Sequence, residues 1–228
     1  MSGTTADLVI FDCDGVLIDS EIISARMLIA ALADRGVGID LDYVAQHFLG
    51  RSYPTVMKTI RTEFGVDLPP EFEEDYRARL LAAFETGLRI MPGVREVLAG
   101  VGVPWCVATS SSRMRAERSL DIVGLRGLVG DKLFTAGEVR NGKPAPDLFF
   151  HAAERMGAAP SRCLVIEDSL NGIKAARAAG MAVWRFTGGT HLAGRDLTPP
   201  PDARADLEFA SFADFFQIAP DLGEAQNA

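Results

Sequence analysis

The feature of this sequence that most restricts its fold is a series of short apolar runs. They lie at residues 8–11, 105–108, 163–166 and 182–186, with a weaker run at 132–135. The runs are largely apolar at successive positions instead of alternating with polar residues. This pattern is typical of strands in a parallel sheet that is covered on both faces.

Helix-like stretches separate the later runs, at residues 113–123, 146–156 and 171–179. Strand and helix therefore alternate from about residue 93 onward, which predicts a doubly wound α/β core. Gly157 and Gly180 follow two of these stretches, where helix ends favour a left-handed residue. A weak strand near 206–209 and a short helix near 212–218 are expected to complete the core.

Residues 20–88 break this alternation. They contain no clear strand, but they contain helical patterns at 21–34, 42–48, 55–64 and 71–84. A helical block between the first strand and the next βα unit predicts an inserted domain. We therefore divide the chain into a core of residues 1–18 and 90–228 and a helical cap of residues 19–89.

Charge and composition limit the kinds of partner. The formal net charge is −8, so an acidic surface would repel nucleic acid and anionic lipid. No apolar run approaches the ~20 residues that a membrane helix needs, and the N-terminus lacks the basic segment of a signal peptide. Cys13, Cys106 and Cys163 lie in or beside apolar runs without metal-like spacing, which indicates reduced thiols. We expect a cytoplasmic monomer or homodimer that binds neither nucleic acid nor membrane.

Two acidic pairs follow apolar runs. Asp12 and Asp14 leave the first run and are followed by Gly15, while Glu167 and Asp168 end the run at 163–166. Each pair alone is compatible with a turn or a helix cap. Because ligands of open α/β sheets bind beyond the carboxyl ends of the strands, the two pairs together predict one site. Clustered carboxylates need a hard cation, and oxygen ligands favour Mg²⁺ over zinc.

Two further elements suit phosphate. The run at 105–108 is followed by four hydroxyl residues, Thr109 to Ser112, that open a helix, where free N–H groups and hydroxyls bind phosphate oxygens. Lys143 precedes two prolines on a stiff loop and could neutralise phosphate and an attacking carboxylate. The histidines, His47, His151 and His191, are isolated, and we expect them at the surface or in packing positions.

In this order, the four elements resemble the haloacid dehalogenase superfamily. Its phosphatase branch carries Asp-x-Asp-Gly, then a serine or threonine at a strand end, then a lysine and then an acidic pair. The matching stretches are 12–21, 143–147 and 167–172, and the resemblance extends over nearly the whole chain. The helical insertion resembles the α-helical cap of the β-phosphoglucomutase and sugar-phosphatase subgroup.

The resemblance implies a role for each matching residue. Asp12 matches the nucleophile and Asp14 the general acid/base. Ser110 matches the phosphate-binding hydroxyl, with Thr109 as an alternative register, and Lys143 matches the family lysine. The implied reaction is hydrolysis of a small phosphorylated metabolite, such as a sugar, sugar-acid or polyol phosphate, through a phosphoaspartate at Asp12.

The resemblance also implies the ligands. Mg²⁺ is the family's metal, held by Asp12, the backbone carbonyl of Asp14 and Asp168, with Glu167 as a direct or indirect helper. The stretch 48–52 resembles the specificity loop of the cap. We therefore assign Gly50 and Arg51 to substrate binding, together with Ser111 of the hydroxyl run.

Several related activities compete with this interpretation. A dehalogenase is disfavoured because that branch lacks the second aspartate of the first motif. A phosphonate hydrolase is disfavoured because that branch has no acid at the position of Asp14 and uses a lysine of the cap, where the only lysine here is Lys58. A non-catalytic module would not need every catalytic position to be filled. The remaining rival is a sugar-phosphate mutase of the β-phosphoglucomutase type. Its polar cap residues correspond here to Ser24, Leu49 and Tyr53, which favours a phosphatase.

Overall fold

The computed structural model of the chain describes residues 6–48, 51, 53–66 and 68–223. Its centre is a six-stranded, fully parallel sheet in the order β3-β2-β1-β4-β5-β6. The strands are β1 Leu8–Phe11, β2 Trp105–Thr109, β3 Leu133–Thr135, β4 Cys163–Glu167, β5 Ala182–Phe186 and β6 Leu207–Phe209. The predicted doubly wound α/β fold is therefore confirmed, including its weak strand at the C-terminal edge.

The apolar runs are explained by burial on both faces of this sheet. Alternate residues of one strand belong to different apolar clusters: Val9 and Phe11 face one side, and Leu8 and Ile10 face the other. All four are fully buried. A strand with one face in water would have alternated apolar and polar residues instead.

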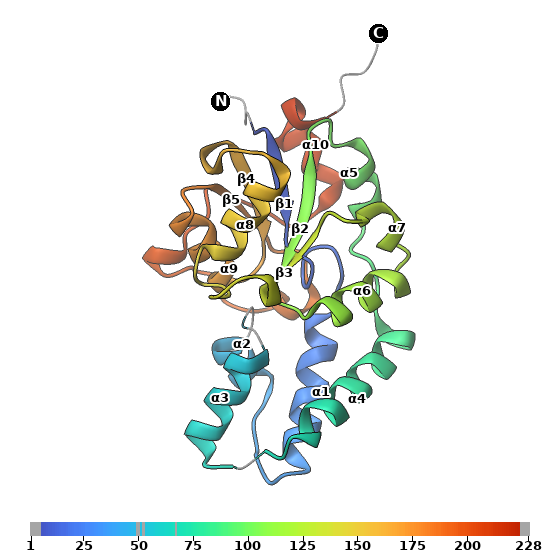
Figure 1. The fold of residues 1–228 in the computed structure, drawn as a ribbon, viewed down its shortest axis with the longest axis vertical. Helices are drawn as coiled ribbons and strands as arrows, with labels where there is room; N and C mark the ends of the chain where they lie inside the picture. The colour runs from blue at the N-terminus through green and yellow to red at the C-terminus, as the bar shows by residue number, and fades with distance from the viewer. Residues whose placement is uncertain (1–5, 49–50, 52, 67, 224–228) are drawn as a thin grey trace.

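Helices cover both faces of the sheet (Figure 1). They are α5 Val94–Gly100, α6 Arg113–Ile122, α7 Arg126–Val129, α8 Asp147–Met156, α9 Leu170–Ala178 and α10 Phe215–Ile218. Ser112 and Ser169 cap α6 and α9, since each side chain accepts a hydrogen bond from a backbone N–H in the first turn. Gly157 and Gly180 have the predicted positive φ, of 73° and 69°.

In the part of the insertion that the structure describes, four helices lie beyond the carboxyl ends of the strands (Figure 1). They are α1 Glu21–Ala33, α2 Leu41–His47, α3 Tyr53–Phe64 and α4 Glu71–Gly87. The two chain segments that join it to the sheet run side by side. The backbone N–H of Asp19 donates to the carbonyl of Arg89 at 2.9 Å, and that of Met91 donates to the carbonyl of Leu17 at 2.9 Å.

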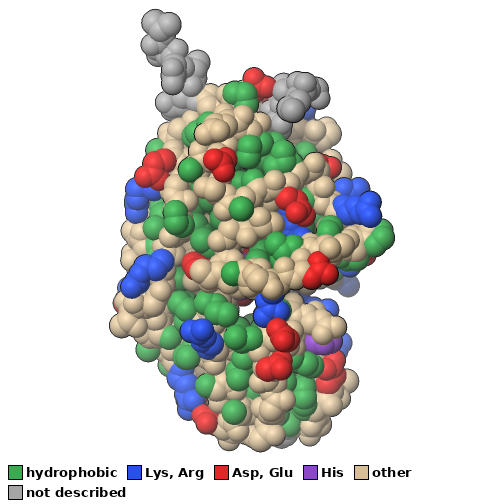
Figure 2. Space-filling model, turned by 180° about the vertical axis from the view of Figure 1, so that it is seen from behind, with side chains coloured by type: hydrophobic (Ala, Val, Ile, Leu, Met, Phe, Trp, Pro, Cys, Tyr) green, Lys and Arg blue, Asp and Glu red, His purple; other side chains and the backbone are tan. Residues whose placement is uncertain are grey.

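A hollow lies between the insertion and the sheet, and Lys or Arg side chains lie at its border in Figure 2. The pocket there has a volume of ≈ 890 Å³. It opens at β1, where the order of the strands reverses, which is the usual ligand site of such sheets. Among the described residues, no helix is long and apolar enough to cross a membrane.

Candidate active site

The register of the sheet places three groups at one level. Phe11 of β1 pairs with Val107 of β2 and with Ile166 of β4. The next residue along each strand is therefore Asp12, Ala108 or Glu167, and these three lie together at the carboxyl edge of the sheet.

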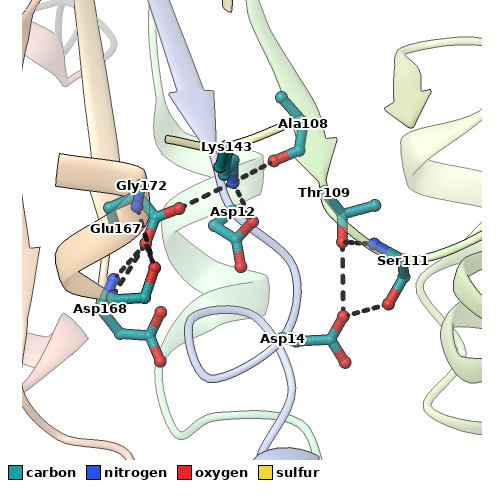
Figure 3. A network of polar contacts seen from close by, with 10 residues as sticks. Asp12, Asp14, Ala108, Thr109, Ser111, Lys143, Glu167, Asp168 and Gly172 are labelled. Atoms are coloured by element: carbon teal, nitrogen blue, oxygen red, sulfur yellow. Dashed lines mark hydrogen bonds and ion pairs between the residues drawn. The ribbon is translucent and has the colours of Figure 1, made fainter. Parts of the chain in front are cut away.

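Lys143 joins these three groups (Figure 3). Its Nζ donates to Asp12 Oδ1 at 2.5 Å, to Glu167 Oε1 at 2.7 Å and to the carbonyl oxygen of Ala108 at 3.0 Å. The lysine side chain is 1% exposed. The two carboxylates outweigh the cost of burying the charge, so the pKa of Lys143 lies above its ordinary value. The site therefore contains a permanent positive charge beside Asp12.

Glu167 is fixed on all sides. Its Oε2 accepts hydrogen bonds from the backbone N–H of Asp168 at 2.9 Å, from that of Ser169 at 2.9 Å and from Ser169 Oγ at 3.0 Å. Gly172 packs directly against it, because a Cβ atom there would lie 1.7 Å from Glu167 Oε1. Both oxygens of Glu167 are thus engaged in holding Lys143 and the start of α9.

Asp12, Glu167 and Asp168 form a buried acidic cluster, with one oxygen from each lying within 4.8 Å of the others. Burial raises the pKa of Asp12 and of Asp168, and neighbouring carboxylates raise both further. Asp168 Oδ2 is buried and accepts no hydrogen bond of suitable geometry among the described residues, although His191 Nε2 lies 2.9 Å away. Gly15 allows the first motif to approach this oxygen, since a Cβ there would lie 1.9 Å from it. An all-oxygen cluster with an unsatisfied carboxylate fits a hard divalent cation.

Asp14 has a different environment (Figure 3). Its carboxylate accepts hydrogen bonds from Ser20 Oγ and Ser111 Oγ, both at 2.6 Å, and from Thr109 Oγ1 at 3.4 Å. Arg115 Nη2 lies 2.8 Å from Asp14 Oδ1. Burial opposes ionisation, but Arg115 and these hydroxyls outweigh it, so the pKa of Asp14 is lowered. The two aspartates of one motif thus have pKa values shifted in opposite directions.

The structure brings most of the sequence-predicted residues to one pocket. Its lining includes Asp12, Asp14, Arg51, Ser110, Ser111, Lys143, Glu167 and Asp168. The hydroxyl groups of Ser111 and Thr109 both donate hydrogen bonds to the carboxylate of Asp14. Gly50 lies outside the described residues, as do Leu49 and Ser52 of the same stretch.

Several residues at the site were not assigned to it from the sequence, among them Arg115, His191 and Ser20, whose Oγ donates to Asp14. Arg115, in the first turn of α6, extends to Asp14. His191 is buried, with Nε2 2.9 Å from Asp168 Oδ2, so it is a packing residue inside the site. Burial lowers the pKa of His191. A signal for Arg115 was available, since it follows the hydroxyl run at a strand end, whereas His191 is 23 residues from Asp168 along the chain.

The fold and the site together define a hydrolase with a doubly wound α/β core, in which an acidic cluster and a buried lysine meet at the carboxyl edge of a parallel sheet. The chain belongs to the haloacid dehalogenase-like hydrolases, whose family model matches residues 6–180.

Curated relatives agree with this assignment. The chain is 31% identical over 186 residues to a 6-phosphogluconate phosphatase of Escherichia coli, covering 81% of this chain and 84% of the relative. It is 37% identical over 180 residues to a fructose-1-phosphate phosphatase of the same organism, covering 75% and 92%. These relatives place the chain in the sugar-phosphatase subgroup and among the phosphoric monoester hydrolases.

A solved structure has the same fold. A haloacid dehalogenase family hydrolase of Deinococcus radiodurans, with bound phosphate and sodium, superimposes with a TM-score of 0.74 at 32% identity. The match covers 99% of this chain and all of that one.

Proposed function

We propose that this enzyme is a Mg²⁺-dependent phosphatase that hydrolyses a sugar, sugar-acid or polyol phosphate through a phosphoaspartate at Asp12. The observation that carries the proposal is the contact of Asp12 with buried Lys143 at the floor of a large pocket. The substrates named for the relatives, 6-phosphogluconate, fructose 1-phosphate and hexitol phosphates, support this substrate class.

Mg²⁺ would be held by Asp12, Asp168 and the backbone carbonyl of Asp14, where it would neutralise charge on the phosphoryl oxygens. Glu167 acts indirectly in this proposal. Its two oxygens already accept hydrogen bonds from Lys143 and from the residues that begin α9.

Asp12 attacks phosphorus as the bond to the leaving oxygen breaks, which gives a mixed anhydride between aspartate and phosphate. Lys143 orients the carboxylate and offsets its charge. Water then attacks the phosphorus of this anhydride and restores Asp12 as a carboxylate, with release of inorganic phosphate.

Asp14 transfers the protons in both half-reactions, the attack by Asp12 and the hydrolysis of the phosphoaspartate. It gives a proton to the leaving oxygen, and it later takes one from the attacking water. Its hydroxyl and guanidinium neighbours stabilise the carboxylate that the second half needs. A phosphate dianion beside it raises its pKa, which favours the acid form that the first half needs.

Residues 19–89 serve as a cap in this proposal, and the rest of the chain is the catalytic core. The cap lines the part of the pocket away from Asp12 with residues of all four of its helices. The leaving group would therefore contact the cap. Hydrolysis is favoured over phosphoryl return to a sugar because Ser24 stands where the mutases carry a histidine, and Leu49 and Tyr53 stand where they carry a lysine and an arginine. The three cysteines are buried and unpaired, which suits a reducing compartment such as the cytoplasm.

The test is phosphate release from p-nitrophenyl phosphate and from a panel of phosphorylated sugars, sugar acids and polyols. We expect release with Mg²⁺ and none in EDTA, because the acidic cluster would then repel the phosphate dianion. Asp12→Asn should reduce turnover by more than a hundredfold, since an amide is a poor nucleophile. Asp7→Asn, at the opposite end of the first strand, is the matched control and should retain activity.

The proposal would be wrong if a chelated, metal-free sample turned over at the full rate. It would also be wrong if Asp12→Asn stayed within tenfold of the unmodified enzyme, with deamidation excluded by mass spectrometry.

A further inference from the structure

The lining of the pocket contains several cationic side chains besides Lys143. These are four arginines, Arg51, Arg77, Arg115 and Arg140. They gather there although the chain carries a formal net charge of −8. Outside the acidic cluster the lining has three carboxylates, Asp14, Glu21 and Glu73, so the four arginines leave that part of the pocket a small positive excess, which favours an anionic ligand.

Arg115 is the most deeply placed of the four. It comes from the core helix α6, and its side chain is 22% exposed. Its Nη2 donates to Asp14 Oδ1 at 2.8 Å and to Ser24 Oγ of α1 at 3.1 Å. Its Cζ atom lies 5.6 Å from the centre of the Phe84 ring of α4. The guanidinium therefore lies where the core meets the two long helices of the cap.

The surroundings satisfy this guanidinium only in part. An arginine is always charged, so its burial requires partners for its N–H groups. Asp14, its carboxylate partner, is shared with Ser20 and Ser111, both at 2.6 Å. Arg115 Nε is buried and has no hydrogen-bond partner among the described residues. Both hydrogen bonds of Arg115 to described residues are made by Nη2, and the side chain stays 22% exposed, so the outer N–H groups of the guanidinium, not the buried Nε, are left for a ligand.

We infer that Arg115 binds a second anionic group, carried by the leaving group of the substrate. This inference rests on the proposed function. Asp14 touches both Arg115 and, in that mechanism, the leaving oxygen. Nη2 then lies about 5–6 Å from that oxygen, the length of two hydrogen bonds in series. The substrates are therefore phosphate monoesters that also carry a carboxylate or a second phosphate, as in a phosphorylated sugar acid or a sugar bisphosphate.

Ser24 fits this role. It is buried, and its Oγ donates to the carbonyl of Ser20 at 2.9 Å, which leaves an oxygen lone pair for Arg115. The serine thus orients the guanidinium from the cap side, at the position that the family resemblance gives to a polar group in mutases.

The experiment uses two matched pairs of substrates. In the first pair, 6-phosphogluconate and sorbitol 6-phosphate differ only in a carboxylate or a CH₂OH group at C1. In the second pair, fructose 1,6-bisphosphate and fructose 1-phosphate differ only in the second phosphate. We expect kcat/KM to favour the anionic member of one pair by at least tenfold, and that pair identifies the anion.

Variants then assign the preference to Arg115. Arg115→Gln should bring the kcat/KM ratio of that pair close to one, mainly through KM of the anionic member, and Arg115→Lys should restore part of it. Arg118→Gln is the matched control. It lies on the same helix and pairs with Glu85 of α4, but both side chains are about half exposed, so its ratio should not change.

Two outcomes would overturn the inference. One is an unmodified enzyme that treats both members of each pair alike while releasing phosphate from them. The other is an Arg115→Gln variant that loses activity by the same factor on both members, which would mean that Arg115 only positions Asp14. An enzyme that hydrolyses none of these compounds, nor p-nitrophenyl phosphate, would refute the proposed function itself.

Discussion

Gly172 determines the position of Lys143 through one contact. A methyl group at this position would overlap Glu167, with its Cβ atom 1.9 Å from Glu167 Cδ. Glu167 in turn holds Lys143 beside Asp12. The absence of a side chain at residue 172 is therefore a condition for the arrangement at Asp12, although the glycine contacts no substrate in the proposed mechanism.

We predict that Gly172→Ala displaces Glu167 and lowers both activity and stability. Overpacking of this kind costs about 1–3 kcal/mol, and turnover should fall at least tenfold as Lys143 loses its position. The measurements are urea unfolding and phosphate release. Gly127→Ala is the matched helical control. A Cβ there meets nothing within 4 Å, so no loss of stability is expected. Unchanged unfolding of Gly172→Ala would contradict the packing argument.

At the residue scale, Glu21 also makes the stability of the folded protein depend on pH. Burial, with help from the Asp14 carboxylate, raises the pKa of Glu21 from 4.5 to about 7. The folded state therefore binds this proton more tightly than the unfolded state. Its contribution to stability is complete below pH ~4.5 and is lost as the pH rises through 7.

Glu21→Gln should thus stabilise the metal-free protein at pH 8 by on the order of 1–3 kcal/mol, and by much less at pH 5. Urea unfolding in EDTA at both pH values measures this. Glu74→Gln, at an exposed position of α4, should show no such difference between the two pH values. A stability gain for Glu21→Gln that is equal at pH 5 and pH 8 would rule out the proposed titration.

The site residues differ in how far the sequence predicted them. The acidic pairs and Lys143 follow apolar runs or stand in a distinctive loop, so local pattern was enough. Arg115 and His191 owe their places to tertiary contacts with Asp14 and Asp168. An isolated histidine has no local pattern that distinguishes it from a solvated or packing residue. The place of Arg115 just after the hydroxyl run is a signal, but it does not tell which residue of the helix faces Asp14.

At the scale of elements, α2 depends on one capping side chain. Asp40 precedes the helix in an extended conformation, and its carboxylate accepts a hydrogen bond from the backbone N–H of Tyr43 at 2.8 Å. The helix has only seven residues, so propensity alone would not maintain it.

We predict that Asp40→Ala destabilises the protein by about 1 kcal/mol, because it leaves a helix N–H without a partner. Asp40→Asn retains a capping oxygen and should lower the stability by only about a few tenths of a kcal/mol. Urea unfolding midpoints compare the two. Equal losses for both variants would show that charge, and not capping, stabilises α2.

Element prediction succeeded where the pattern was long or strongly apolar. The strand runs at 8–11 and 182–186 have the predicted bounds, and the other strands and the long helices differ by a few residues at their ends. Two helices of the core, α5 and α7, were not predicted. They have seven and four residues, and such short helices hold their shape through packing that no local periodicity reveals.

At the scale of the whole molecule, two paired segments join residues 19–89, the cap of the proposed function, to the sheet. We expect a hinge near residues 18–20 and 89–93, with closure that excludes bulk water during attack by Asp12. A phosphatase must then admit water to the phosphoaspartate, whereas a mutase must exclude it until sugar returns.

We predict that the enzyme hydrolyses and does not isomerise. With β-glucose 1-phosphate, Mg²⁺ and a trace of glucose 1,6-bisphosphate, any phosphoryl transfer should appear as free phosphate. Free phosphate and glucose 6-phosphate are followed together. Rapid formation of glucose 6-phosphate with little free phosphate would show that the mutase alternative is correct.

The pairing of the two joining segments has a consequence for how such proteins can diversify. Ile18 and Ile90 form an antiparallel bridge, so the chain leaves the sheet and returns to it at nearly the same point. The two joining segments are paired like the ends of a hairpin, and the entire insertion takes the place of its turn. The closure entropy of a loop grows slowly with its length, so this turn can be enlarged, shortened or exchanged at little cost to the strands beneath it. With the leaving group contacting the cap, as proposed above, substrate range can evolve in the insertion while the chemistry at the strand ends stays unchanged.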